Sequence, residues 1–142
     1  MKSLVRSENE TAQLAADLAP SLQKGDVVLL HGTLGTGKTV FARSLIRTLT
    51  DSADLEVPSP TFTLVQTYNA DPAPIYHFDL YRLESPDEIF ELGWEEALAE
   101  GIVIVEWPER LGPYKPRAPL DISISAVENN DNARQILIEK NS

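Results

Sequence analysis

The stretch HGTLGTGKT, residues 31–39, decides how the rest of this sequence is interpreted. Within it, the segment from Gly32 to Thr39 fits the pattern G-x-x-x-x-G-K-[ST] in full. Glycines let such a loop fold back so that successive backbone N–H groups point at phosphate oxygens, and a helix that follows presents its positive end to the same place. The pattern therefore predicts a phosphate-binding loop, with an ordinary glycine turn as the alternative.

The residues on either side of the loop favour the phosphate-binding interpretation. The apolar run Val27–Leu30 is typical of a strand buried on both faces, and Phe41, Leu45 and Leu49 follow the loop at helical spacing. Lys38 would reach the β and γ phosphates of a nucleotide, and Thr39 would place its hydroxyl on Mg²⁺. The predicted nucleotide contacts of this segment are Gly35, Thr36, Gly37, Lys38, Thr39 and Val40. The guanine-specifying pattern Asn-Lys-x-Asp is absent from the sequence, which favours ATP over GTP.

Composition narrows the class of protein. The chain of 142 residues carries 12 Lys and Arg against 22 Asp and Glu, a net charge of −10, and its size suits one globular domain over residues 1–142. Negative charge repels the phosphate backbone of nucleic acids, so we expect no strong direct binding of RNA or DNA. The sequence has no Cys, which excludes disulfides and thiol chemistry. Neither a secretory signal nor a membrane-spanning segment is visible, so we expect a cytoplasmic protein with no membrane partner.

Turn residues and apolar periodicity divide the chain into helices and strands. Ser7 and Glu10 have the spacing of a capping box, which predicts a helix that Pro20 ends or kinks. Ser85 and Pro86 predict the start of another helix. Further predicted elements are a hairpin of strands 61–68 and 75–79, a helix over 94–100, a strand over 102–105 and a terminal hairpin of 120–125 with 134–139. This order predicts an α/β fold similar to P-loop NTPases, with a mostly parallel central sheet, flanking helices and antiparallel hairpin additions.

Two acidic residues lie near the ends of predicted strands. Glu106 directly follows Ile102–Val105, and the carboxyl end of a parallel strand lies at the ligand crevice. There Glu106 would hold the Mg²⁺ shell or orient a water; a solvated glutamate is the alternative. Period-two geometry puts His77, Asp79 and Tyr81 on one face if their strand continues that far. Asp79 would then be a second carboxylate at the metal or would position the attacking water, unless it caps the strand end.

A threonine and a tryptophan complete the candidate site. Thr61 follows the stiff segment Pro58-Ser59-Pro60. In nucleotide switches a loop threonine contacts Mg²⁺ and the γ-phosphate, so Thr61 would be such a residue or else part of a plain proline-bounded turn. Trp107 follows Glu106 and would pack in the core, line the nucleotide or meet a partner.

These motifs, in this order, resemble the TsaE (YjeE) family of bacterial ATPases. The resemblance rests on the glycine loop and on three further segments: residues 59–62 (SPTF), 77–82 (HFDLYR) and 106–110 (EWPER). It implies that Asp79 and Glu106 are essential carboxylates near the metal and that Thr61 is a switch threonine. It also implies a functional tryptophan at Trp107 and an adenine contact at Thr11. Where the family usually has an acid, this sequence has Thr33, and Thr36 and Val40 also depart from the usual residues.

The resemblance further implies an activity and partners. Family members support formation of threonylcarbamoyladenosine on tRNA together with TsaD and TsaB, and do not make the modification themselves. The predicted function is thus a Mg²⁺-dependent ATPase acting as an accessory subunit, in which Lys38, Asp79 and Glu106 carry the catalysis. We expect slow hydrolysis without partners, with Arg82 and Arg110 as candidate arginines for the transition state. A small-molecule kinase and a non-hydrolytic, nucleotide-gated binding module remain the alternatives.

Overall fold

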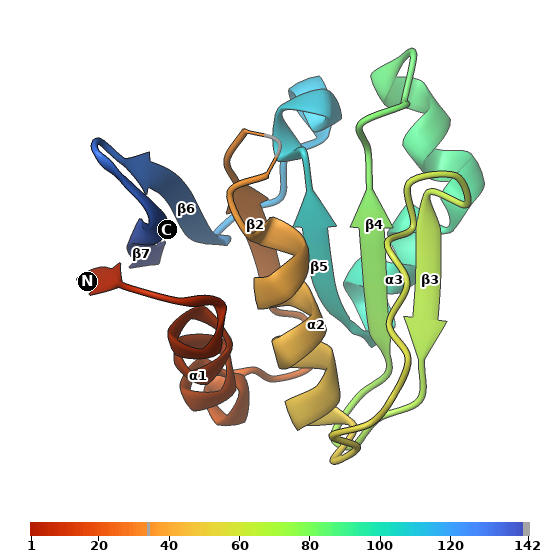
Figure 1. Ribbon diagram of the computed structural model, residues 1–142. Coiled ribbons are helices and arrows are strands. Elements are labelled where there is room, and N and C mark those ends of the chain that lie inside the picture. The colour runs from red at the N-terminus through yellow and green to blue at the C-terminus, as the bar shows by residue number, and fades with distance from the viewer. Residues whose placement is uncertain (34, 141–142) are drawn as a thin grey trace.

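The computed structural model describes residues 1–33 and 35–140 as one seven-stranded sheet with helices on both faces (Figure 1). The elements are β1 (Lys2–Val5), α1 (Glu8–Leu18), β2 (Val27–His31), α2 (Lys38–Leu49), β3 (Val65–Tyr68), β4 (Ile75–Asp79), α3 (Trp94–Glu100), β5 (Ile102–Glu106), β6 (Leu120–Val127) and β7 (Asn130–Lys140). Short 3-10 segments cover Ala19–Ser21, Pro86–Leu92 and Pro108–Tyr114.

The sheet has a parallel centre and antiparallel edges. The strand order is β1-β7-β6-β2-β5-β4-β3, in which β2 runs parallel to both β5 and β6, and β4 runs parallel to β5. The hairpins β3–β4 and β6–β7 add antiparallel strands on either side. The α/β prediction, with its mostly parallel centre and hairpin additions, is therefore confirmed.

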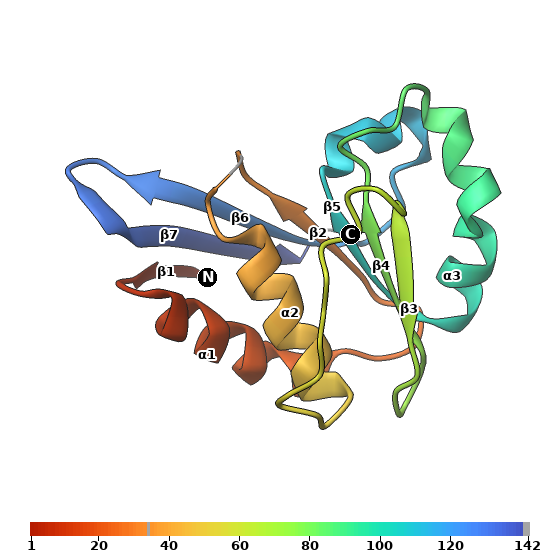
Figure 2. The ribbon, with the colours of Figure 1, turned by 45° about the vertical axis from the view of Figure 1, so that its right-hand side comes forward.

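The helices form two layers that bury opposite faces of the central strands. Figure 2 shows α1 and α2 on one side of the sheet and α3 on the other. Val28 and Leu30 pack with Phe41 of α2, while Val27 and Leu29 pack on the α3 side. Every residue of Val27–Leu30 is therefore buried, which explains the continuous apolar run in the sequence.

The start of α1 has the predicted cap in a modified form. The Oγ of Ser7 accepts the Glu10 N–H at 3.1 Å, and the Glu10 carboxylate accepts the N–H of Arg6 at 3.1 Å rather than that of Ser7. The helix ends at Leu18, and Pro20 lies in the 3-10 turn that follows, as its ring requires.

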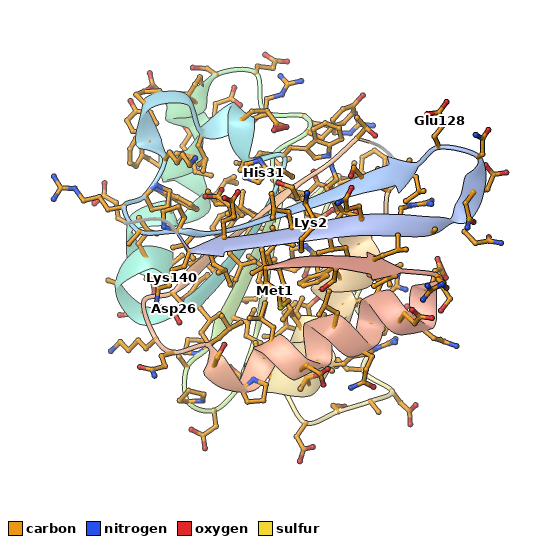
Figure 3. All side chains as sticks on the ribbon, turned by 90° about the vertical axis from the view of Figure 1, so that its left-hand side faces the viewer. Met1, Lys2, Asp26, His31, Glu128 and Lys140 are labelled. Atoms are coloured by element: carbon orange, nitrogen blue, oxygen red, sulfur yellow. The ribbon has the colours of Figure 1, made fainter. Side chains whose placement is uncertain are left out.

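One strand at the edge of the sheet was not predicted. β1 pairs antiparallel with β7, and the N-terminal amine of Met1 donates to the Ile138 carbonyl at 2.8 Å. Figure 3 shows β1 lying between β7 and α1. Four residues, of which two are exposed and one is buried, carry too weak a periodicity to identify such a strand without its partner.

One local prediction was wrong, and two others were met in part. β3 begins at Val65 instead of residue 61, because a turn closed by the Leu64 N–H on the Pro60 carbonyl at 2.6 Å precedes it, with Leu64 at a φ of +69°. β4 spans Ile75–Asp79 as predicted, so the strand does not continue to Tyr81, and Tyr81 does not share a strand face with His77 and Asp79. A helix begins at Pro86 after Ser85, as predicted, but it is of the 3-10 kind and the Ser85 side chain does not cap it. Within 1–33 and 35–140, no helix combines the length and the apolar character that crossing a membrane requires.

Candidate functional site

The glycine loop joins the carboxyl end of β2 to the first turn of α2, at the edge of the sheet where β4 and β5 also end (Figure 1). Gly37 is the residue before α2, with a φ of +111°, and no side chain caps the helix. The first N–H groups of this 12-residue helix are therefore available to an anion, and its dipole favours negative charge there. Leu34, part of the sequence motif, lies outside the described residues.

The loop is held tightly against the sheet at its first glycine. A Cβ at Gly32 would lie 2.6 Å from the Thr36 Oγ1 and 2.7 Å from the Ile124 carbonyl oxygen of β6, so only glycine fits. The Thr36 hydroxyl donates to the Thr33 carbonyl at 2.9 Å. Thr36 therefore closes the loop internally.

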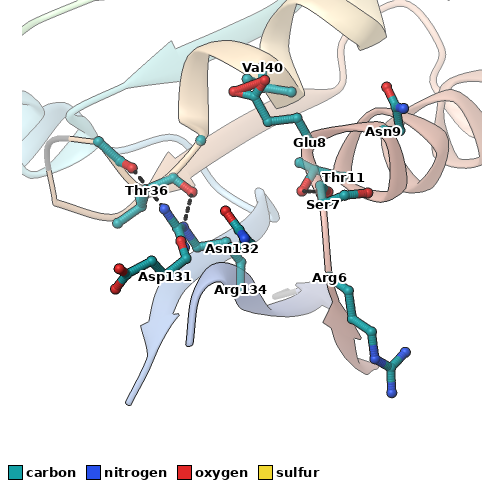
Figure 4. A pocket seen from close by; sticks show the side chains of 12 residues that line it. Arg6, Ser7, Glu8, Asn9, Thr11, Thr36, Val40, Asp131, Asn132 and Arg134 are labelled. Atoms are coloured by element: carbon teal, nitrogen blue, oxygen red, sulfur yellow. Dashed lines mark hydrogen bonds between the residues drawn. The ribbon is translucent and has the colours of Figure 1, made fainter. Parts of the chain in front are cut away.

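An arginine from the end of the chain also holds the loop. Arg134 of β7 donates through Nε to the Thr36 carbonyl at 3.1 Å and through a terminal nitrogen to the Gly35 carbonyl at 3.3 Å (Figure 4). Sequence reasoning missed Arg134, since a residue 98 positions away from Thr36 carries no local signal of this contact.

Lys38 lies almost fully buried at the start of α2. Its ammonium donates to the Gly32 carbonyl at 2.7 Å and lies 3.3 Å from the centroid of the Trp107 ring. Burial lowers the pKa of Lys38 below 10.5, while Glu106, Glu109 and Asp79 act in the opposite direction. One carbonyl occupies only part of the ammonium's donor capacity, so further acceptors such as phosphate oxygens can be bound.

Thr39 and Glu106 meet beside this lysine. The Thr39 hydroxyl donates to Glu106 Oε1 at 3.3 Å, and the other carboxylate oxygen, Oε2, lies 2.7 Å from His77 Nε2. Glu106 and His77 are both buried, and each oxygen of the carboxylate has one protein partner. The alternative of a solvated glutamate after the strand is therefore excluded.

Asp79 is next to Glu106 in the β4–β5 register but makes separate contacts. Its Oδ2 accepts the Thr61 hydroxyl at 3.1 Å and the Ser59 hydroxyl at 3.5 Å, and its Oδ1 accepts the Tyr81 N–H at 3.0 Å. The carboxylate therefore ties the segment after α2 to the end of β4. Ser59 was not predicted as a site residue, although it is in the proline-bounded segment that drew attention to Thr61.

Two cavities collect the predicted residues. The first, of about 280 Å³, is lined by Glu8, Gly35, Gly37, Lys38, Thr39, Val40, Ser59, Thr61, Asp79, Glu106 and Trp107. The second, of about 540 Å³, shares Glu8, Gly35, Gly37 and Val40 with it and adds, among others, Thr11, Thr36 and Arg134 (Figure 4). The Thr11 hydroxyl donates to the Ser7 carbonyl at 3.3 Å. All predicted site residues thus line one continuous region, and Glu8, missed by sequence reasoning, lines both cavities.

The donor set of the smaller cavity fits a nucleotide phosphate with a divalent cation. Helix N–H groups and the Lys38 ammonium suit phosphate oxygens. The Thr39 hydroxyl and the Glu106 carboxylate are hard oxygen ligands, and Mg²⁺ in proteins commonly takes one or two carboxylates together with substrate phosphates. Thr39 and Glu106 would hold the cation, with Asp79 at the neighbouring register position.

Comparisons with known proteins agree on one family. The family model described as "Threonylcarbamoyl adenosine biosynthesis protein TsaE" matches residues 5–136. The chain is 45% identical over 126 residues to the tRNA threonylcarbamoyladenosine biosynthesis protein TsaE of Rickettsia conorii, covering 89% of this chain and 71% of that protein. It is 37% identical over 135 residues to the protein of the same name from Aquifex aeolicus, covering 95% and 92% of the two chains. The crystal structure of Bacillus subtilis YdiB matches with a TM-score of 0.79 and 29% identity over 100% of this chain and 86% of that one.

Proposed function

This chain belongs to the TsaE family of tRNA threonylcarbamoyladenosine biosynthesis proteins, and from that premise we propose that it binds and hydrolyses ATP with Mg²⁺ as an accessory subunit of this pathway. Its proposed partners are TsaD and TsaB. The observation that carries the ATPase proposal is the convergence of Lys38, Thr39 and Glu106 at the N-terminus of α2.

Each of these residues has a chemical role in the proposal. Lys38 would bind the β and γ phosphates, which its buried ammonium can do without competition from bulk water. Thr39 and Glu106 would hold Mg²⁺, which neutralises the charge that develops on the phosphates. Thr61 and Asp79 are hydrogen-bonded to one another and both line the cavity, which supports a role for the Thr61 segment in responding to the nucleotide.

The surroundings of the cavity support a site that a partner completes. Neither arginine considered for the transition state lines it: the Arg82 guanidinium stacks 4.5 Å from the ring centroid of Phe62, and Arg110 donates to the Leu83 carbonyl at 3.4 Å. Phe62 is 82% exposed, so its ring is available for contact with a partner. With a net charge of −10, the chain as a whole suits a protein partner better than tRNA.

The test compares ATP hydrolysis with and without purified TsaD and TsaB. We expect slow release of phosphate by the isolated protein, a faster rate in the mixture, and loss of both rates in Lys38→Ala and Glu106→Gln. Lys24→Ala, an exposed lysine remote from the loop, is the matched control and should behave as the unmodified protein. A rate that ignores the partners, or that survives both site variants, would contradict the proposal. Transfer of phosphate to a metabolite in place of water would select the kinase alternative.

A further inference from the structure

We propose that His77 is a positioning residue, whose Nε2–H fixes the Glu106 carboxylate so that its other oxygen stays at Thr39. The inference rests on the proposed function in one respect, namely that Thr39 and Glu106 hold Mg²⁺. Nothing in the sequence motif of the glycine loop assigns a role to this histidine.

The sheet register places His77 within reach of Glu106. His77 is opposite Ile104 of β5, and two residues later Asp79 is opposite Glu106. Alternation along β4 therefore puts Ile75, His77 and Asp79 on the same face of the sheet. Ile75 belongs to the core beneath α1 and α2, so His77 lies where this apolar face gives way to the site. From there the ring reaches the Glu106 side chain diagonally.

The hydrogen bond between His77 and Glu106 is short, and both side chains are buried. Nε2 lies 2.7 Å from Glu106 Oε2, and the side chains are 1% and 3% exposed. Glu106 Oε1 accepts the Thr39 hydroxyl, so each carboxylate oxygen has its own partner. Removing the histidine would leave Oε2 buried without a donor and the carboxylate free to rotate.

The other ring nitrogen fixes the direction of this hydrogen bond. His77 Nδ1 is buried and has no hydrogen-bond partner among residues 1–33 and 35–140. A proton on Nε2 gives Glu106 a donor and avoids an unpaired N–H at Nδ1. We therefore assign the ring proton of this hydrogen bond to Nε2.

The arrangement keeps two neighbouring carboxylates in separate roles. Asp79 is held by Thr61, Ser59 and the Tyr81 N–H, whereas Glu106 is held by His77 and Thr39. Removing a hydrogen-bond donor to a metal-binding carboxylate typically lowers metal affinity or activity about 10–100-fold. His77 is expected to act through Glu106 in this range, without touching nucleotide.

The experiment compares His77→Leu, which removes the donor, with His77→Gln, whose side-chain amide can still donate. Calorimetry measures ATP affinity with Mg²⁺ and with EDTA, and kinetics separate kcat from KM. For His77→Leu we expect the ATP affinity measured with Mg²⁺, and kcat, to fall about tenfold or more. The ATP affinity measured in EDTA should stay unchanged. For His77→Gln we expect most of the lost affinity and kcat to be recovered. Gln66→Leu on the neighbouring strand, in register with His77, is the matched control for a polar-to-leucine exchange.

A measurement without ligand tests the inference separately. The chain has 2 histidines, so His31→Gln assigns the imidazole ¹⁵N resonances of His77. A protonated Nε2 and an unprotonated Nδ1, with a shift of the Nε2–H signal in Glu106→Ala, are expected. A proton on Nδ1, or equal Mg²⁺ responses of His77→Leu and His77→Gln in folded protein, would overturn the inference. Failure of the unmodified protein to bind ATP would instead contradict the proposed function, while the ¹⁵N result would still decide the hydrogen bond.

Discussion

Replacing Gly32 by Ala tests the close approach of the glycine loop to β6. The new methyl group would lie 2.7 Å from the Ile124 carbonyl oxygen, a backbone atom that the sheet holds in place, and the φ of +154° disfavours any side chain. Overpacking of this kind costs about 1–3 kcal/mol. Backbone strain at a positive φ adds about 1–2 kcal/mol. We therefore expect Gly32→Ala to lower the free energy of unfolding by about 2–5 kcal/mol.

Gly25→Ala separates the two contributions. Gly25 has a φ of +94° but no atom within 4 Å of an added Cβ, so this variant carries the backbone strain alone. The difference between the variants should be about 1–3 kcal/mol in urea unfolding, or about 3–10 °C in melting temperature. ATP affinity should fall in Gly32→Ala, because the Gly32 carbonyl also accepts the Lys38 ammonium. Equal unfolding midpoints for the two variants would refute the reasoning.

Three further predictions concern the side chains around the loop. Arg134→Gln removes two hydrogen bonds to loop carbonyls, so ATP affinity measured by calorimetry should fall several-fold while the far-ultraviolet spectrum stays unchanged. Burial lowers the pKa of Lys38, so its ammonium loses its proton at a pH below 10.5. ATP affinity should therefore decline as the pH rises toward 10.5. A decline that begins only above pH 10.5 would contradict the lowered pKa of Lys38. Nucleotide binding should change the fluorescence of Trp107, which covers Lys38, and Trp107→Phe should abolish the response while Trp94→Phe retains it.

The sequence predicted those elements whose signals are local. α3 has the predicted bounds because Gly93 and Gly101 flank it, and β4 has the predicted bounds, with the turn segment 69–74 marking its start. Glu106 was placed beside the loop because the carboxyl ends of parallel strands share an edge. Thr61 was assigned to a strand from its composition, but its hydroxyl bonds to Asp79 and its segment forms a turn. Whether this segment forms a turn or a strand depends on a tertiary contact, which local propensity does not reflect.

Long-range contacts account for what was missed at the site. Glu8, at the start of α1, lines both cavities, but its sequence context indicates only a helix terminus. Arg134 lies in an alternating strand where arginine is an ordinary exposed residue. Their positions follow from the packing of α1 against α2 and from the β6–β7 hairpin, which no pattern within either segment specifies.

The hydrogen bonds from Arg134 of β7 to the glycine loop form late during synthesis of the chain. The loop and its helix leave the ribosome early, whereas Arg134, which binds the loop carbonyls, is translated about 100 residues later. β1 likewise has no partner until β7 exists. A nascent chain stalled before the last hairpin would therefore carry the complete phosphate motif without the Arg134 contacts to its loop. It should gain full nucleotide affinity only when the final strand is released from the ribosome.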